Sequence, residues 1–216
     1  SKREVLELAG LDAHTSMLAF NKQQAKRRIL RDPRVSGVEI VKLFPDTVRI
    51  YVMEKERKSV LIVGSNEGRP RSDSQPAGGK AFWLSRDGVV LAEAAESEGS
   101  EHPGPIVTLE SNVDDIRIGG RLGDYLLVSV LRALEGIESR YPGFYRRIGH
   151  VSIGRDGVRV RLENDRYSIY LGESVSEEKL ERLRALLLVL ESRGDGGDGS
   201  VEIDMSSSNA AIGKRE

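Results

Sequence analysis

The sequence predicts an α+β protein: a small module of two helices on a short sheet, followed by a larger, strand-rich β domain with a C-terminal helix and a final strand. Three observations support this class. In residues 1–64, helical spacing of apolar side chains gives way to the alternation typical of strands. Residues 65–80 are rich in Gly, Pro and Ser. Beyond them, short alternating runs precede a leucine-rich helix and one more strand.

Two helices are expected near the start of the chain. Residues 2–9 form the first, and Gly10 ends it because glycine tolerates the left-handed backbone of a helix C-cap. Asn21 is a favourable N-cap for a second helix over residues 22–31. Pro33 prevents that helix from continuing.

Strands complete the first module. Residues 35–44 and 48–52 alternate apolar and polar side chains on either side of a turn, which predicts a hairpin. Residues 59–63 form a short apolar strand that we assign to the same module. The module therefore has the order helix, helix, strand, strand and the size of a small independent domain.

Three stretches have the composition of surface loops: residues 65–80, 92–105 and 193–200. The first of them separates two periodic regions, so we expect a linker there, between a first domain over residues 1–64 and a second over residues 81–216. Limited proteolysis within this linker is then expected to release two stable pieces.

The second domain is predicted from short strands and two longer helices. One helix begins near Asp124, and Ser176 caps another, whose leucines recur at helical spacing. Residues 210–212 are expected to extend the last strand. The predicted strands cover residues 81–84, 89–91, 106–109, 148–153, 158–162, 167–171 and 201–205.

The composition excludes several classes of protein. The 216 residues carry a formal net charge of −1, which gives no overall attraction to nucleic acid. The absence of cysteine excludes disulfides, thiol catalysis and cysteine-ligated metals. No apolar run is long enough to cross a membrane. Because the sequence begins with Ser1 instead of Met, we expect a piece of a longer protein whose membrane anchor lies elsewhere.

No pattern of residues points to catalysis or metal binding. His14, His102 and His150 are far apart, and none has a second ligand at metal-binding spacing. Asp114 and Asp115 are the minimum for acid–base chemistry, but adjacent residues of an extended chain point to opposite faces, which favours a solvated loop. We therefore predict a protein that is not an enzyme and has no cofactor and no metal.

Basic residues cluster at residues 26–28 and 146–147. One interpretation is a face for nucleic acid or anionic lipid. The first cluster lies on the polar side of an amphipathic helix, and acidic residues are spread along the whole chain. The sequence therefore favours a simple solvated surface at these positions.

Several short motifs occur in the order found in one known family. LAGL at residues 8–11, LRDPRV at 30–35 and FPDTVRI at 44–50 resemble the POTRA domain of the FtsQ/DivIB cell-division family. Two features depart from that pattern. The domain usually ends in E-R-x-P, of which only Glu54 is present, and its usual first strand lies outside this sequence.

The second half continues the resemblance. WLSRDGVV at residues 83–90 resembles a hairpin of the family, with Ser85 in place of the usual aspartate. YLG at 170–172 resembles the segment that leads into the last helix of the family's domain. IDM at 203–205 and NAAI at 209–212 resemble its terminal strand.

The resemblance implies a membrane-anchored scaffold of bacterial cell division, without enzymatic activity, on the extracytoplasmic (periplasmic) face of the cytoplasmic membrane. The implied partners are FtsB/DivIC-type and FtsL-type proteins and, through them, the septal peptidoglycan synthase complex. It implies no nucleic acid as a partner, and membrane contact only through a single-pass anchor outside this sequence.

Two alternatives remain at this point. One is a chaperone-like POTRA module of outer-membrane protein assembly or secretion, which predicts a second helix–helix–strand–strand copy within residues 81–216. The other is an enzyme, for example a hydrolase that uses Asp114 and Asp115.

The terminal strand is the predicted partner site. Alternating side chains at residues 201–205 should face the core, while the small side chains that follow leave backbone groups accessible to a partner strand. A proline at Ser207 or Ala210 is expected to remove a backbone donor and abolish binding. The predicted site residues are Val201, Ile203, Met205, Ser206, Ser207, Ser208, Asn209, Ala210, Ala211 and Ile212.

Overall fold

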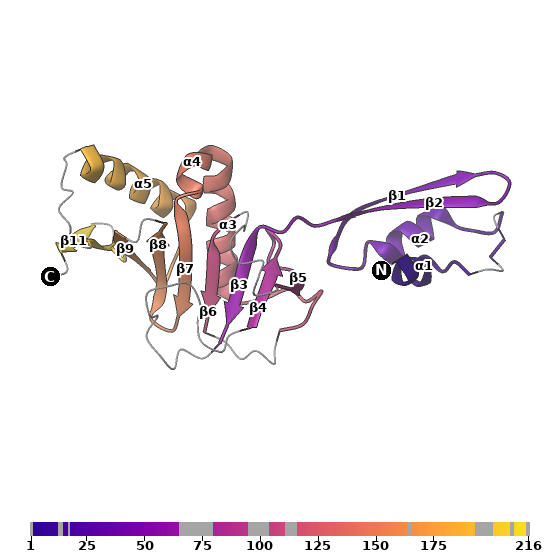
Figure 1. The fold of residues 1–216 in the computed structure, drawn as a ribbon, viewed down its shortest axis with the longest axis horizontal. Helices are drawn as coiled ribbons and strands as arrows, with labels where there is room; N and C mark the ends of the chain where they lie inside the picture. The colour runs from indigo at the N-terminus through magenta and orange to yellow at the C-terminus, as the bar shows by residue number, and fades with distance from the viewer. Residues whose placement is uncertain are drawn as a thin grey trace. The chain divides into compact units, whose positions relative to one another are not determined.

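The computed structural model divides the chain into two compact units, Ser1–Glu56 and Arg57–Glu216 (Figure 1). The mixture of helices and strands in both units confirms the predicted α+β class. The described residues are 2–12, 15–16, 18–64, 80–94, 104–110, 116–163, 166–192, 201–207 and 210–214.

The first unit packs two helices on a two-stranded antiparallel sheet. Helices α1 (Lys2–Ala9) and α2 (Lys22–Ile29) precede strands β1 (Val35–Leu43) and β2 (Thr47–Glu54). The backbone N–H of Gln24 donates to Asn21 Oδ1 at 3.0 Å, which is the predicted N-cap of α2. The buried core of the unit consists of Ala9, Phe20, Ala25, Ile29, Val38 and Ile40.

Arg34, directly before β1, joins helix α1 to the segment between α2 and β1. Its guanidinium donates to Asp32 at 2.6 Å and to Glu4 on α1 at 2.6 Å. Hydrogen bonding to Arg34 lowers the pKa of Asp32, whose side chain is largely covered. Because the folded-state pKa is depressed, this contribution to stability is present above the ordinary pKa of an aspartate and is lost as the pH falls through the lowered value.

The second unit is built on one nine-stranded sheet with the order β11-β10-β9-β8-β7-β6-β3-β4-β5. Most neighbouring strands are antiparallel, but β3 and β6, β6 and β7, and β9 and β10 are parallel pairs. The strands are β3 (Ser59–Val63), β4 (Lys80–Leu84), β5 (Val90–Glu93), β6 (Ile106–Leu109), β7 (Ile148–Gly154), β8 (Gly157–Leu162), β9 (Tyr167–Gly172), β10 (Val201–Asp204) and β11 (Ala211–Lys214).

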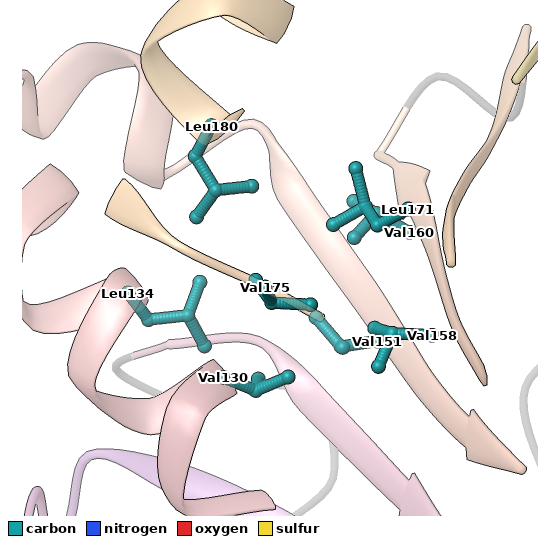
Figure 2. Close-up of a pocket in the computed structure, with 8 residues that line it drawn as sticks. All are labelled: Val130, Leu134, Val151, Val158, Val160, Leu171, Val175 and Leu180. Carbon is teal, nitrogen blue, oxygen red and sulfur yellow. The ribbon is translucent and has the colours of Figure 1, made fainter. Parts of the chain in front are cut away.

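Two long helices pack on one face of this sheet. Helices α3 (Tyr125–Arg140) and α5 (Glu177–Ser192) supply most of the helical core residues, and the one-turn helix α4 (Pro142–Tyr145) adds Phe144 and Tyr145. Figure 2 shows where α3 and α5 converge over the strands: a small cavity lined only by aliphatic side chains. Its lining is Val130, Leu134, Val151, Val158, Val160, Leu171, Val175 and Leu180.

The two long helices begin where the sequence predicts. Asp124 Oδ1 accepts the backbone N–H of Leu127 at 2.8 Å, and Ser176 Oγ accepts that of Lys179 at 3.2 Å. The leucine stripe of α5 is also confirmed: Leu180, Leu183 and Leu187 are fully buried, and Leu190 packs at the edge of the core. Among the described helices, none is long and apolar enough to cross a membrane.

The strand β3 corrects one assignment made from the sequence. It pairs with β4 and β6 and thus belongs to the second unit, so the boundary falls between Glu56 and Arg57 and not after residue 64. A short apolar strand has no periodicity that reveals its partners, and only the sheet decides where it belongs. The expected linker at 65–80 lies, apart from Lys80, outside the described residues, as do residues 95–103 and 193–200 of the other two loops.

This pairing changes the expected result of proteolysis. A single cut within residues 65–79 should leave two fragments that stay associated under native conditions, because β3 remains hydrogen-bonded between β4 and β6. Size-exclusion chromatography of the nicked protein, followed by mass spectrometry, checks this outcome. Fragments that separate without denaturant would contradict it.

The two units have separate cores, so matched core substitutions should act on one unit each. Ile40 and Ile169 are both fully buried, in the first and the second core respectively. Ile→Ala at either position should cost about 2–5 kcal/mol in its own unit. In hydrogen-exchange mass spectrometry, Ile40→Ala should remove protection from residues 2–54 only, and Ile169→Ala from the second unit only. Loss of protection in both units from one substitution would show that they unfold together.

Candidate functional site at the edge of the large sheet

The predicted site residues fall into three structural groups. Val201 and Ile203 lie in β10, and Met205 follows it directly. Ser206, Ser207 and Ala210 lie between β10 and β11. Ala211 and Ile212 begin β11. Ser208 and Asn209 lie outside the described residues.

The first group is part of the core. Val201, Ile203 and Met205 are 8%, 0% and 1% exposed, and they pack in the same core as the leucines of α5. Met205 N–H also donates to the carbonyl of Tyr170 on β9 at 2.8 Å. These three side chains hold β10 in the sheet, and none of them is accessible to a partner.

The second group follows β10, and its first residue, Ser206, lies close to Gly172 at the end of β9. Ser206 N–H donates to Asp204 Oδ1 at 2.8 Å, and this backbone hydrogen bond lowers the pKa of Asp204. A Cβ placed on Gly172 would lie 3.1 Å from the Cα of Ser206, and Gly172 itself has a φ of +77°. The left-handed backbone favours glycine at this position, and a Cβ there would also require Ser206 to shift by a few tenths of an ångström.

The third group corrects the sequence-based picture of the terminal strand. Residues 210–212 do not extend β10. Instead, β11 folds back and pairs antiparallel with β10, with Ile203 opposite Ile212 and Asp204 opposite Ala211. Strand β10 is thus paired on both sides, and β11 is the outermost strand of the sheet at this end. Its residues from Ala211 to Gly213 are exposed.

The two ends of the sheet differ in how they are covered. At the β5 end, Val90 N–H donates to the carbonyl of Gly120 at 2.9 Å, and its own carbonyl accepts from Gly119 at 2.7 Å. A β-bridge between Val89 and Arg121 extends this cover. No comparable segment pairs with the outer side of β11 among the described residues. The free row of backbone donors and acceptors on β11 is what a partner strand needs.

The candidate catalytic residues are mostly outside the described part of the chain: Asp114, Asp115, His14 and His102 all lie there. His150 lies in β7, and its Nε2 is 2.5 Å from Thr108 Oγ1 on the neighbouring strand β6. Within the described ranges, no three His, Asp or Glu side chains come together as metal ligands. The geometry at the β11 edge offers backbone groups for strand pairing.

Comparison with known families assigns both units. Residues 1–55 match the FtsQ-type POTRA domain, in agreement with the first structural unit. Residues 75–206 match the C-terminal domain of the cell-division protein FtsQ/DivIB.

The chain belongs to the FtsQ/DivIB family of cell-division proteins.

The family assignment confirms the resemblance found in the sequence motifs. The matched range of the second unit ends at residue 206, so β11 lies beyond it. Members of the family are membrane-anchored scaffold proteins of cell division.

Curated relatives named cell division protein FtsQ agree with this assignment. The chain is 25% identical to the protein of Bartonella bacilliformis over 203 residues, 87% of this chain and 63% of that protein. It is 28% identical to that of Rhizobium meliloti over 151 residues, 66% of this chain and 46% of the relative. With the Rhizobium radiobacter protein it shares 38% identity over 56 residues, 26% of this chain and 27% of the relative. The chain thus spans less than two thirds of each of these relatives.

Gly172→Ala should disturb the route of the chain from β10 to β11. The substitution places a Cβ against Ser206 and forces a left-handed backbone on alanine, and the backbone cost alone is about 1–2 kcal/mol. We expect lower stability in urea denaturation and loss of hydrogen-exchange protection at residues 201–214. Gly143→Ala, in helix α4 with no atom within 4 Å of its added Cβ, is the matched control and should leave both measurements unchanged. Equal effects of the two substitutions would mean that the contact with Ser206 is unimportant.

Proposed function

We propose that this chain is a non-enzymatic scaffold of bacterial cell division that binds FtsB/DivIC- and FtsL-type partners by strand addition to β11. Through these partners it links to the septal peptidoglycan synthase complex. The proposed location is the extracytoplasmic (periplasmic) face of the cytoplasmic membrane. The match to the FtsQ/DivIB family supports this proposal.

The main support for the proposal is that the two outermost strands of the nine-stranded sheet differ in their pairing with other segments. At the β5 end, residues 119–121 pair with Val89 and Val90, whereas no described segment pairs with the outer side of β11, whose residues 211–213 are exposed. Unpaired strand edges are usually protected in soluble proteins, because they bind other strands indiscriminately. An outermost strand that no described segment covers is therefore a candidate for a dedicated partner.

The residues of β11 suit recognition through the backbone. Ala211 and Gly213 have little or no side chain to obstruct an approaching strand. Ile212 is 48% exposed and offers one apolar contact. Main-chain hydrogen bonds would then provide most of the affinity, and the apolar side chain would contribute to register and specificity.

The assignment of the second unit favours this function over the alternative of a chaperone-like POTRA module in outer-membrane protein assembly or secretion. Residues 75–206 match the C-terminal domain of FtsQ/DivIB. The POTRA match to residues 1–55 is likewise of the FtsQ type. Neither match points to an assembly or secretion protein.

The test is a proline placed on the edge strand. Neighbouring residues of a strand direct their backbone N–H groups alternately toward and away from the paired strand. Of Ala211→Pro and Ile212→Pro, one therefore removes an outward N–H and the other an N–H that faces β10. The outward change should abolish binding of an FtsB/DivIC-type segment in a pull-down while leaving the melting temperature unchanged. The inward change should lower both partner binding and the melting temperature.

A matched control comes from the turn. Ser207 precedes β11 and is exposed, so Ser207→Pro should leave binding nearly intact, contrary to the expectation from the sequence alone. Partner binding that survives both prolines of β11 would place the interface elsewhere. Loss of binding with Ser207→Pro, but with neither β11 variant, would assign it to the turn.

A further inference from the structure

Helix α2 of the first unit is basic, and several of its charged side chains form no ion pair with another described residue. Helix α2 contains Lys22, Lys26, Arg27 and Arg28 and no acidic residue, and all of its residues except Ala25 and Ile29 are exposed. Lys22, Lys26 and Arg27 form no ion pair with another described residue. In the second unit, by contrast, Arg140 and Arg147 pair with glutamates of α5.

Local helix stability does not explain the charge at the start of α2. The N-terminus of a helix carries partial positive charge, which favours acidic residues there and disfavours lysine. Lys22 nevertheless occupies the first position of the helix, and the first turn has no acidic residue. Residues 1–56 hold eleven Lys and Arg against eight Asp and Glu, an excess of three positive charges in a chain whose net charge is −1.

Two highly exposed apolar side chains lie near this end of α2. Leu18 is 84% exposed, the highest value for a large apolar residue in the described chain, and Phe44 is 69% exposed. The Lys42 ammonium lies 5.4 Å from the centre of the Phe20 ring, and this contact joins the segment of Leu18 to the strand end that leads to Phe44. In Figure 1 the start of α2 and the β1–β2 turn lie at the same end of the first unit.

Two acidic side chains at this end keep their charge and accept hydrogen bonds from neighbouring threonine hydroxyls. Asp12 Oδ1 accepts the hydroxyl of Thr15 at 2.7 Å, and Asp46 Oδ1 accepts that of Thr47 at 3.0 Å. On α1, Glu7 pairs with Arg3, and Glu4 with Arg34. Lys22, at the start of α2, and Lys26, in its last turn, are exposed and form no ion pair with a described carboxylate.

We propose that this end of the first unit is a membrane-contact surface that binds anionic lipid headgroups. Leu18 and Phe44 insert into the interfacial layer of the bilayer, and Lys22 and Lys26 bind the headgroup phosphates. The protruding side chains stand on two separate loops and do not form a flat apolar face, which suits insertion between lipids better than docking of a folded protein. Exposed basic residues beside such side chains are the charge complement of an anionic bilayer. This inference is independent of strand addition at β11.

Vesicle binding of the full chain tests the proposal. The wild-type chain should co-sediment with phosphatidylglycerol–phosphatidylcholine vesicles, more weakly as salt is raised, and should not bind pure phosphatidylcholine vesicles. The double substitution Leu18→Ala, Phe44→Ala should reduce the partition coefficient roughly tenfold by removing the inserted apolar area. Lys22→Gln with Lys26→Gln should reduce it about tenfold or more at low salt and weaken the dependence on salt.

Matched controls come from the second unit. Tyr125 is 75% exposed, and Lys80 and Arg132 are exposed basic residues. Tyr125→Ala, and Lys80→Gln with Arg132→Gln, should leave vesicle binding unchanged. Circular dichroism establishes that each variant is folded. No binding of the wild-type chain to anionic vesicles, equal binding to neutral ones, or equal loss in the control variants would overturn the proposal.

Discussion

The parallel pairing of β10 with β9 is the constraint on which the C-terminal part of the molecule depends. Parallel neighbours cannot be joined by a tight turn, so the chain must cross over between them, and α5 is the described helix of that crossover. The leucines of α5 cover the face on which Ile203 lies. Once β10 is fixed by this crossover, the turn at Ser206 returns the chain as β11, and the outer edge of the sheet is determined.

The stability of this edge depends on a few contacts behind it. The backbone N–H groups of Val201 and Met205 donate to carbonyls of Arg166 and Tyr170 at 2.9 and 2.8 Å. The side chains of Val201, Ile203 and Met205 are buried in the main core. Strand β11 itself adds exposed residues and no buried ones among Ala211–Gly213. The well-packed strand β10 therefore supports β11, which has little packing of its own. Such a strand can exchange its contacts with water for contacts with a partner strand.

The two units leave different kinds of groups unpaired at their surfaces. In the second unit the free groups belong to the backbone of β11, and several charges on the helices form ion pairs, such as that of Arg140 with Glu181. In the first unit, the free groups are side chains: lysines of α2 without described ion-pair partners, together with exposed Leu18 and Phe44. The first arrangement favours a peptide strand, and the second favours an anionic surface with an apolar layer beneath it.

The sequence by itself determined the α+β class, the helix caps at Asn21, Asp124 and Ser176, and the leucine stripe of α5. These features depend on residues close together in the chain, whose capping hydrogen bonds and 3.6-residue periodicity can be read directly. Motif order also identified the family, which the match of residues 75–206 confirms.

The hairpin of β1 and β2 could be predicted from the sequence, but only the tertiary structure decided the partners of β3 and β11. The apolar run of β3 looks the same whether it joins the first unit or the nine-stranded sheet, and its partners β4 and β6 lie far along the chain. The return of β11 likewise could not be distinguished from an extension of β10, because Ile212 suits either course. Strand pairing satisfies backbone groups that every residue possesses, so side-chain sequence specifies it weakly, and the open edge at β11 became visible only when all nine strands were placed.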